Sequence, residues 1–203
     1  MRRNLNIAFL MDPLEKLDLK GDTTFALAFE AQRRKHLISF FKPEDLIFNN
    51  NDVLANICKL ELSSSNNLYD FEYHNTSIKS LSKYDVVMMR QDPPFNMAYI
   101  TATHILEKLP NSTLVVNNPF EVRNSPEKIF VTNFSHLMPK TLISRNIDAI
   151  KEFRKQFKDI IIKPLYGNGG QGIFHILPED ENLNSILEMF FSQNKEPLMI
   201  QEY

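Results

Sequence analysis

A glycine-rich segment late in the chain has the composition of a phosphate-binding loop. The segment "IIKPLYGNGGQGIF" (161–174) places Gly167, Gly169, Gly170 and Gly172 within six residues, although the 203-residue chain has only 5 glycines. Glycine in a regular element costs roughly 0.5–1 kcal/mol relative to alanine. A plain turn needs one or two glycines. Four of them therefore indicate a backbone that closely approaches a ligand.

Two nucleotide-binding motifs match this segment only in part. A Walker A loop requires Lys and Ser or Thr after its last glycine, but Ile173 and Phe174 follow Gly172. A dinucleotide-binding G-x-G-x-x-G must open a helix, whereas "GIFHIL" is β-branched, aromatic and apolar, which predicts a strand. The glycines are therefore predicted to form a flap that joins two strands.

Lys163 lies on the predicted strand that leads into the flap, four residues before Gly167. A flap with free amide groups and a fixed cation at its base can hold the phosphates of ATP. Protein kinases also cover ATP with a flap, but they need H-R-D and D-F-G motifs, which this sequence does not contain. The structural alternative is a tight turn beside a surface lysine.

The elements before the flap predict an α/β protein. Apolar runs at 5–11 and 37–41 enclose a helix with Thr23 or Thr24 as its N-cap, which indicates a βαβ unit of a parallel sheet. Further strands are predicted at 84–89 and 113–117, with a helix over 96–109 between them. Two β-leaning runs around 49–52 predict an inserted hairpin.

The second half predicts a smaller α/β arrangement. Ser125 is the expected N-cap of a helix with Pro126 at its first position, and Asn146 is the expected cap of another. The remaining predicted elements are strands at 140–144, 159–165, 172–177 and 197–203, and helices at 147–157 and 183–194. Because the sequence ends within an apolar strand, we expect a truncated protein. The predicted domains are 1–122 and 123–203.

Composition excludes several classes of protein. The chain has 23 Lys plus Arg and 25 Asp plus Glu, for a net charge of -2, so we expect no nucleic-acid partner. We expect no signal sequence, because the apolar run near the first residue is too short for one, and there is no run of about 18 apolar residues. Both observations predict a cytoplasmic protein without a membrane partner. Its one cysteine, Cys58, is expected to be a buried strand residue, and none of its 5 histidines is spaced with another for a metal.

Several motifs together resemble one enzyme family. They are "MDP", "KGDTTF", "EAQRR", "MRQDPPF", "VNNP", "EKIF", "KPLYGNGG" and the terminal "QEY". With these motifs the chain resembles bacterial-type glutathione synthetase, an ATP-grasp ligase family, over its whole length, and it matches the first two-thirds of that longer family. The resemblance implies an N-terminal parallel-sheet (pre-ATP-grasp) domain followed by the first part of an ATP-grasp fold. It also implies joining of γ-glutamylcysteine to glycine through an acyl phosphate, with ATP and Mg²⁺.

The resemblance also implies roles for particular residues. Lys163 and Arg90 are the implied catalytic residues. The nucleotide is implied to bind Lys128, Lys163, Gly167, Asn168, Gly169, Gly170, Gln171, Gly172, Gln201, Glu202 and Tyr203. The dipeptide is implied to bind Arg90, Lys20, Asp22 and Thr23. The family's magnesium ligands fall in its C-terminal part, so we expect no metal site in this chain and no complete catalysis by the fragment alone.

Alternative interpretations exist for the residues and for the function. Arg90 could form an ion pair across the strand end, and Lys128 could be a solvated helix lysine. The chain could belong to another ATP-grasp ligase that joins a carboxylate to an amine. It could also be a truncated nucleotide-binding or interaction module, or a gene product without function. For the full-length family member we expect a homo-oligomer.

Overall fold

The chain divides into two compact units, which we describe separately. The structure is a computed structural model and describes residues 3–65, 68–167 and 169–203. The first unit comprises Met1–Asp92 and Asn96–Asn124, and the second comprises Pro93–Phe95 and Ser125–Tyr203. The domain boundary predicted between residues 122 and 123 stays a prediction, because compact units need not be functional domains.

The first unit is built on four parallel strands, as predicted. They are β1 (Asn6–Leu10), β2 (Leu37–Phe41), β6 (Val86–Met89) and β7 (Leu114–Val116), in the order β2-β1-β6-β7. From β1 the chain passes through α1 (Thr23–Arg33) to β2 on one side, and β6 is later added on the other side of β1. The strand order therefore reverses between β1 and β6, which is where open α/β sheets bind ligands.

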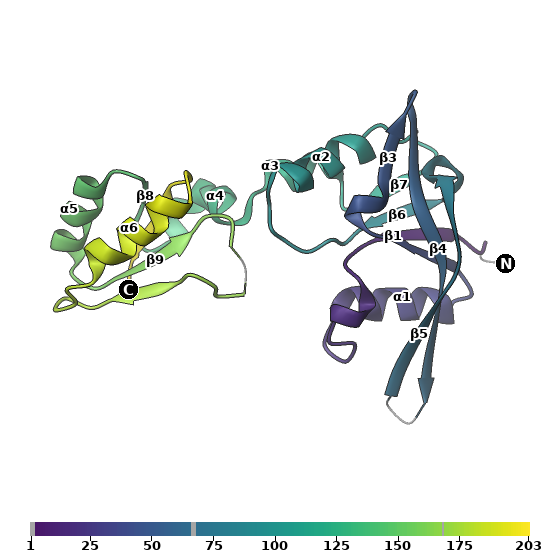
Figure 1. The fold of residues 1–203 in the computed structure, drawn as a ribbon, viewed down its shortest axis with the longest axis horizontal. Helices are drawn as coiled ribbons and strands as arrows, with labels where there is room; N and C mark the ends of the chain where they lie inside the picture. The colour runs from purple at the N-terminus through teal and green to yellow at the C-terminus, as the bar shows by residue number, and fades with distance from the viewer. Residues whose placement is uncertain (1–2, 66–67, 168) are drawn as a thin grey trace. The chain divides into compact units, whose positions relative to one another are not determined.

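A helix covers each face of this sheet (Figure 1). Phe25 and Ala28 of α1 belong to the same buried cluster as Phe9, on one face of β1. Leu10 points to the other face, where it belongs to a cluster with Leu106 of α2 (Met97–Leu106). Burial on both faces explains why the strands are almost continuously apolar.

Antiparallel strands extend the sheet beyond β2. The predicted hairpin is confirmed as β3 (Leu46–Asn49) and β4 (Asp52–Ser65), with Asn50 and Asn51 at φ 47° and 68° in its turn. The prediction missed β5 (Leu68–Ser80), which pairs with β4 along its length. A register shift in β4 and the positive φ of Asn75 interrupt the two-residue alternation by which a strand is recognised.

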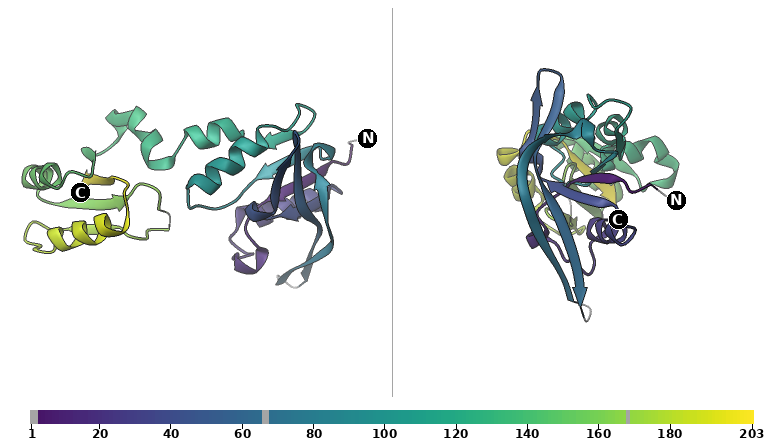
Figure 2. Two further views of the ribbon diagram at one scale, coloured as in Figure 1. Left: turned by 45° about the horizontal axis from the view of Figure 1, so that its top comes forward. Right: turned by 90° about the vertical axis from the view of Figure 1, so that its right-hand side faces the viewer.

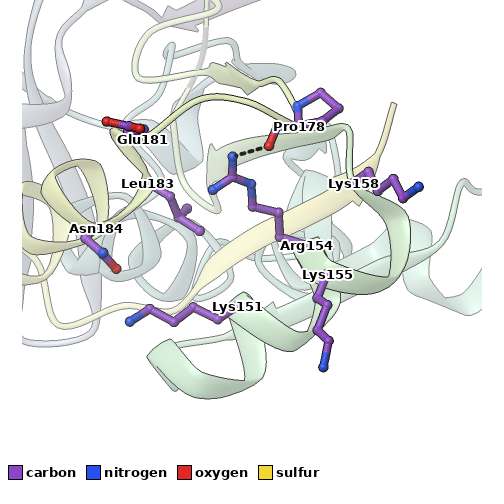
Figure 3. A pocket seen from close by; sticks show the side chains of 8 residues that line it. All are labelled: Lys151, Arg154, Lys155, Lys158, Pro178, Glu181, Leu183 and Asn184. Atoms are coloured by element: carbon purple, nitrogen blue, oxygen red, sulfur yellow. Dashed lines mark hydrogen bonds between the residues drawn. The ribbon is translucent and has the colours of Figure 1, made fainter.

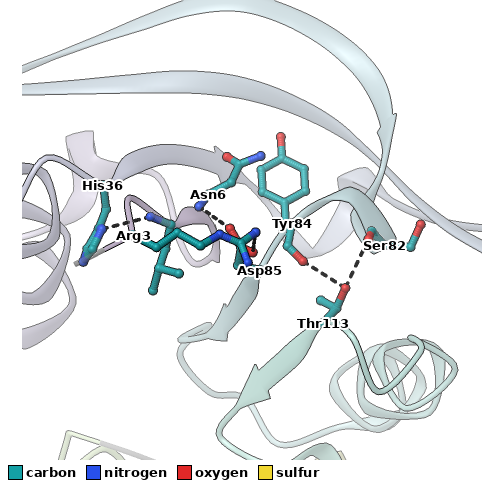
Figure 4. Close-up of polar contacts among 8 residues, drawn as sticks. Arg3, Asn6, His36, Ser82, Tyr84, Asp85 and Thr113 are labelled. Carbon is teal, nitrogen blue, oxygen red and sulfur yellow. Dashed lines mark hydrogen bonds and ion pairs between the residues drawn. The ribbon is translucent and has the colours of Figure 1, made fainter. Parts of the chain in front are cut away.

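The amino ends of the parallel strands carry a polar network (Figure 4). Asn6 N donates to Asp85 Oδ2 at 2.8 Å, and Arg3 donates to the other oxygen of this carboxylate at 2.7 Å. Thr113 Oγ1 donates to Tyr84 O at 2.9 Å and lies 3.3 Å from Ser82 O. These contacts join the segments that precede β1, β6 and β7, so they fix the sheet at the end opposite to the carboxyl ends of its strands.

Replacing Thr113 with valine is expected to lower the free energy of unfolding by about 1–2 kcal/mol. Thr113 is only 5% exposed, so its loss leaves the Tyr84 carbonyl without this donor while the side-chain volume stays nearly constant. Urea unfolding followed by circular dichroism measures the change. Thr101→Val, at an exposed position of α2, is the control and should change stability by less than about 0.5 kcal/mol. Equal effects of the two substitutions would contradict the assigned role.

The second unit has a four-stranded antiparallel sheet with helices on one face (Figure 2). Its strands are β8 (Thr141–Ser144), β9 (Ile160–Pro164), β10 (Phe174–Ile176) and β11 (Leu198–Glu202), in the order β10-β9-β11-β8. α5 (Ile147–Phe157) and α6 (Leu183–Gln193) pack against the same face, since Ile150 and Leu187 share a cluster with Ile162 and Ile200. The elements predicted for this part are confirmed.

Short helices connect these elements, and two predicted helix caps were wrong. The connecting helices are α3 (Pro119–Asn124), α4 (Glu127–Phe130) and the 3-10 helices Leu14–Lys16, Pro43–Asp45, Leu81–Lys83 and Val131–Leu137. Asp22, not a threonine, caps α1, because its carboxylate accepts from Phe25 N at 2.6 Å. Pro126, not Ser125, occupies the N-cap position of α4. Asn146 caps α5 as predicted.

Two further sequence predictions can be compared with the structure. Cys58 lies in β4 and is 7% exposed, which confirms a buried strand residue. None of the helices in the described ranges combines the length and the apolar character that a membrane span requires.

Candidate functional site

The glycine-rich loop connects β9 to β10, as the sequence predicts. β10 runs antiparallel to β9, with Phe174 opposite Ile162 and Ile176 opposite Ile160. The loop therefore opens a strand, and both the Rossmann and the Walker A interpretations are excluded. We call residues 165–173 the flap; its residue Asn168, predicted to bind the nucleotide, lies outside the described residues.

Three of the flap glycines have a backbone that other residues rarely adopt. Gly169, Gly170 and Gly172 have φ of +60°, +76° and +68°, in the left-handed region. A Cβ at Gly172 would also lie 3.0 Å from Pro164 Cγ, whereas at Gly169 and Gly170 it would meet nothing within 4 Å. The glycines at the tip therefore leave open space above the flap backbone, which a ligand could approach closely.

Lys163 projects from the sheet face opposite to α5 and α6. Its neighbours Ile160 and Ile162 contribute to the core under the helices, and alternate residues of a strand point to opposite faces. Lys163 Nζ donates to Gln201 Oε1 at 2.6 Å, and Gln201 Nε2 donates to Thr141 Oγ1 at 3.0 Å. Gln201 is 7% exposed. This chain of hydrogen bonds across β9, β11 and β8 holds the lysine in position, a role for the Gln201 side chain that the sequence did not indicate.

Lys128 reaches the flap from α4. Its Nζ donates to Gly167 O at 2.6 Å. Burial lowers the pKa of Lys128 from its ordinary value; the Glu127 carboxylate opposes this shift, and the positive charge of Lys163 lowers the pKa further. Within the described part of the chain, neither lysine has a carboxylate within 4 Å. Two like charges placed near one another without a shared counter-ion favour binding of a polyanion, and this arrangement fits the phosphates of ATP.

Glu202 and Tyr203 follow Gln201 at the end of the sheet. Glu202 N donates to Lys140 O at 3.0 Å, and Tyr203 N donates to Asp159 O at 3.2 Å. Tyr203 is 75% exposed, and the centroid of its ring lies 4.2 Å from that of His175. Both backbone donors are therefore occupied by protein carbonyls, and recognition of the adenine edge by this segment stays a prediction.

The predicted substrate-side residues lie in the first unit, around Arg90 at the end of β6. Arg90 Nε donates to Thr24 Oγ1 at 3.1 Å, and Nη2 donates to Thr23 Oγ1 at 2.9 Å. The hydroxyls are neutral, and no described carboxylate lies within 4 Å of the guanidinium, so the guanidinium has no directly bonded counter-ion. The described residues therefore do not form the alternative ion pair at Arg90. Lys20 is exposed, and only its backbone N–H, which donates to Asp18, has a described partner.

Two carboxylates that sequence reasoning did not assign to the site, those of Asp12 and Asp92, lie near Arg90. Asp12 follows β1, and its Oδ2 accepts from Asp92 N at 2.8 Å. Partial desolvation raises the pKa of Asp92, the Asp12 and Asp22 carboxylates raise it further, and Arg90 opposes them. Burial raises the pKa of Tyr99 on α2, the Asp92 charge adds to the shift and Arg90 opposes it. Only their position in the sequence could have indicated Asp12 and Asp92 as site residues: each directly precedes a proline just after a parallel strand.

The described residues contain no cluster of metal-ligating side chains. Residues 3–65, 68–167 and 169–203 contain no group of three or more His, Cys, Asp or Glu side chains that could hold one. We therefore assign no step to Mg²⁺ within this chain.

A separate hollow of about 630 Å³ lies on the second unit (Figure 3). It is lined by Lys151, Arg154, Lys155, Lys158, Pro178, Glu181, Leu183 and Asn184. Arg154 donates to the carbonyls of Leu177 at 2.8 Å and Asp180 at 2.5 Å, so its guanidinium fixes the turn before α6. None of the predicted site residues lines this hollow.

Solved structures define the class of fold. The RimK domain protein ATP-grasp from Sphaerobacter thermophilus matches 98% of this chain and 63% of its own, with a TM-score of 0.62 at 14% identity. D-cycloserine synthetase DcsG matches 98% of this chain and 59% of its own, with a TM-score of 0.62 at 13% identity. Identities this low show the fold alone. The chain therefore has an ATP-grasp fold, with the flap and its two lysines in the second unit.

The chain belongs to the prokaryotic glutathione synthetase family. Its residues 5–123 match the family's N-terminal domain, and residues 127–203 match its ATP-grasp domain. Glutathione synthetases of Mesorhizobium japonicum and Rhodopseudomonas palustris are 49% and 46% identical over 98% of this chain, and that of Buchnera aphidicola subsp. Schizaphis graminum is 37% identical over all of it. The chain spans 63% of the length of each of these relatives. The resemblance inferred from the motifs is confirmed.

Proposed function

We propose that the protein joins γ-glutamylcysteine to glycine at the expense of ATP and yields glutathione, ADP and phosphate. One observation carries this proposal: Lys128 and Lys163, with no described counter-ion, lie at the base of a glycine-rich flap in a chain of the prokaryotic glutathione synthetase family. Cations fixed in this way can bind the phosphates of ATP before the reaction begins.

The reaction requires two steps. An oxygen of the cysteinyl carboxylate attacks the γ-phosphorus of ATP, the bond to the β-phosphate oxygen breaks, and ADP leaves. The glycine amine then attacks the acyl carbon, the bond from this carbon to the phosphate oxygen breaks, and the amine releases a proton. Lys163 and Lys128 would neutralise the charge on the phosphates in the first step. The flap would keep water from the acyl phosphate, which water would otherwise hydrolyse.

The remaining parts of the proposal follow from the family resemblance. Arg90 would bind a carboxylate of the dipeptide, because its guanidinium can donate two parallel hydrogen bonds. Mg²⁺ would accompany ATP, with ligands in the C-terminal part of the family. Because ATP is the proposed co-substrate, the cytoplasm is the proposed location, and a homo-oligomer is the proposed assembly.

An assay of ADP release tests the proposed function. The protein expressed from its complete gene is incubated with MgATP, γ-glutamylcysteine and glycine, and both ADP and glutathione are measured. We expect one glutathione for each ADP and no ADP release above background when the dipeptide is omitted. ADP release that does not depend on γ-glutamylcysteine would overturn the proposal.

The same assay separates the alternative functions. Another carboxylate–amine ligase would release ADP with a different carboxylate and would ignore γ-glutamylcysteine. A nucleotide-binding module would bind ATP, as calorimetry detects, without releasing ADP under any combination of substrates.

A further inference from the structure

Positive and negative side chains meet where the strand order of the first unit reverses. Asp12 follows β1, whereas Arg90 and Asp92 follow the adjacent strand β6. Asp22 caps the N-terminus of α1, the helix that follows β1. This position outside the carboxyl ends of two neighbouring parallel strands is where open α/β sheets bind ligands.

The side chains at this position retain binding capacity for a ligand of mixed charge. Arg90 is held by the hydroxyls of Thr23 and Thr24, so its orientation is fixed while its charge is not neutralised. One oxygen of Asp12 accepts from Asp92 N, and its other oxygen has no described donor. Asp92 is exposed, and its carboxylate accepts no hydrogen bond from the described residues. The site therefore combines a guanidinium that has no described carboxylate within 4 Å with two carboxylates that can still accept hydrogen bonds.

A ligand that matches this arrangement carries a carboxylate and an ammonium group on neighbouring atoms, as the head group of an α-amino acid does. Arg90, held by the hydroxyls of Thr23 and Thr24, is the cation that would bind the carboxylate. The ammonium group would then face Asp12 and Asp92. A phosphate would be repelled by the aspartates, and a simple amine would leave Arg90 without a partner.

The proposed substrate contains one such head group. γ-Glutamylcysteine has two carboxylates and one ammonium group, and its cysteinyl carboxylate must react with ATP. The head group that remains is the α-amino-acid end of the γ-glutamyl residue. We propose that Arg90 binds the α-carboxylate of this end and that Asp12 and Asp92 bind its α-ammonium group. This inference deepens the proposed function and rests on it for the identity of the ligand.

Two substrate analogues separate the proposed contacts. Glutarylcysteine lacks the α-ammonium group, and 4-aminobutanoylcysteine lacks the α-carboxylate. Calorimetry with the protein from its complete gene, in the presence of Mg²⁺ and the non-hydrolysable ATP analogue AMPPNP, measures their affinities. Each analogue should bind the unsubstituted protein about 10- to 100-fold more weakly than γ-glutamylcysteine, as expected for the loss of charge-assisted hydrogen bonds.

Substitutions assign each contact to its residue. Asp92→Asn should weaken binding of γ-glutamylcysteine about 10-fold and leave glutarylcysteine unaffected. The difference in affinity between these two ligands should therefore become smaller, with Asp12 as the remaining partner of the ammonium group. Arg90→Ala should instead weaken binding of γ-glutamylcysteine until its affinity equals that of 4-aminobutanoylcysteine, which lacks the α-carboxylate. Asp70→Asn, at an exposed position of β5, is the matched control and should change none of the three affinities. Unchanged affinity for AMPPNP verifies that each variant is folded.

The outcomes distinguish this inference from the proposed function. Selective binding without glutathione synthesis would refute the proposed function and leave the head-group site standing. Glutathione synthesis combined with equal affinity for γ-glutamylcysteine and glutarylcysteine would overturn the site alone. The site would also be overturned if none of the three ligands bound. It would be overturned as well if Asp92→Asn reduced the affinities for γ-glutamylcysteine and for glutarylcysteine equally.

Discussion

Replacing Lys163 with alanine is expected to lower kcat/KM for ATP by about 100- to 1,000-fold, the usual effect of removing one fixed donor to developing charge. The ammonium group is held by the buried Gln201, so its position is fixed before the nucleotide arrives. Only Lys128, which donates to Gly167 O in the flap, would remain to neutralise phosphate charge. The ADP-release assay at saturating dipeptide and glycine measures the change.

Matched variants separate this effect from a loss of stability. Lys155→Ala removes a lysine whose side chain is 79% exposed on α5 and should leave kcat/KM for ATP unchanged. Gln201→Leu keeps the lysine but removes the acceptor that orients it, so a smaller decrease is expected. If Lys163→Ala reduced the unfolding midpoint while kcat/KM stayed unchanged, the lysine would be structural and its assignment to the phosphates would be wrong.

Elements of the fold that depend on short stretches of sequence, such as single strands and tight turns, could be predicted. The strand after Gly172 was predicted because Ile173 to Leu177 are β-forming residues between a glycine and a proline. The Asn-rich turn between β3 and β4 was predicted because asparagine tolerates positive φ, which Asn50 and Asn51 adopt. β5 has no comparable signal, since its pairing with β4 contains a register shift and much of it is exposed.

The geometry of the site depends on contacts that sequence spacing does not reveal. Lys163 and Gln201 are 38 residues apart and meet only because β9 and β11 pair in one particular register. Asp12 and Asp92 are 80 residues apart and meet because β6 is added beside β1 rather than beside β2. Motifs could identify Lys163 and Arg90 one at a time, but the partners that orient them follow from strand order and register.

Replacing Gly172 with alanine is expected to lower the free energy of unfolding by about 2 kcal/mol, because two separate penalties act at this position. Its φ of +68° is unfavourable for any residue with a Cβ. The added Cβ would also lie 3.0 Å from Pro164 Cγ, and a proline ring in β9 cannot move aside as a flexible side chain can. Affinity for ATP should fall as well, since Gly172 lies where the flap joins β10 and a shift there would move the flap backbone.

Two other glycines allow the penalties to be measured one at a time. At Gly170, φ is +76° but a Cβ would meet nothing within 4 Å, so Gly170→Ala should cost only the conformational part, about 1 kcal/mol. At Gly167, φ lies outside the unfavourable range and the nearest contact would be an ordinary 3.6 Å, so Gly167→Ala should be nearly neutral for stability. Urea unfolding of the three variants should therefore rank Gly172→Ala as most destabilised, then Gly170→Ala, then Gly167→Ala. Equal stabilities would mean that the flap adapts to an added Cβ without loss of folding free energy, so that its glycines serve only the approach of a ligand. The expected order would instead show that the backbone conformation of these glycines is part of the fold before ATP binds.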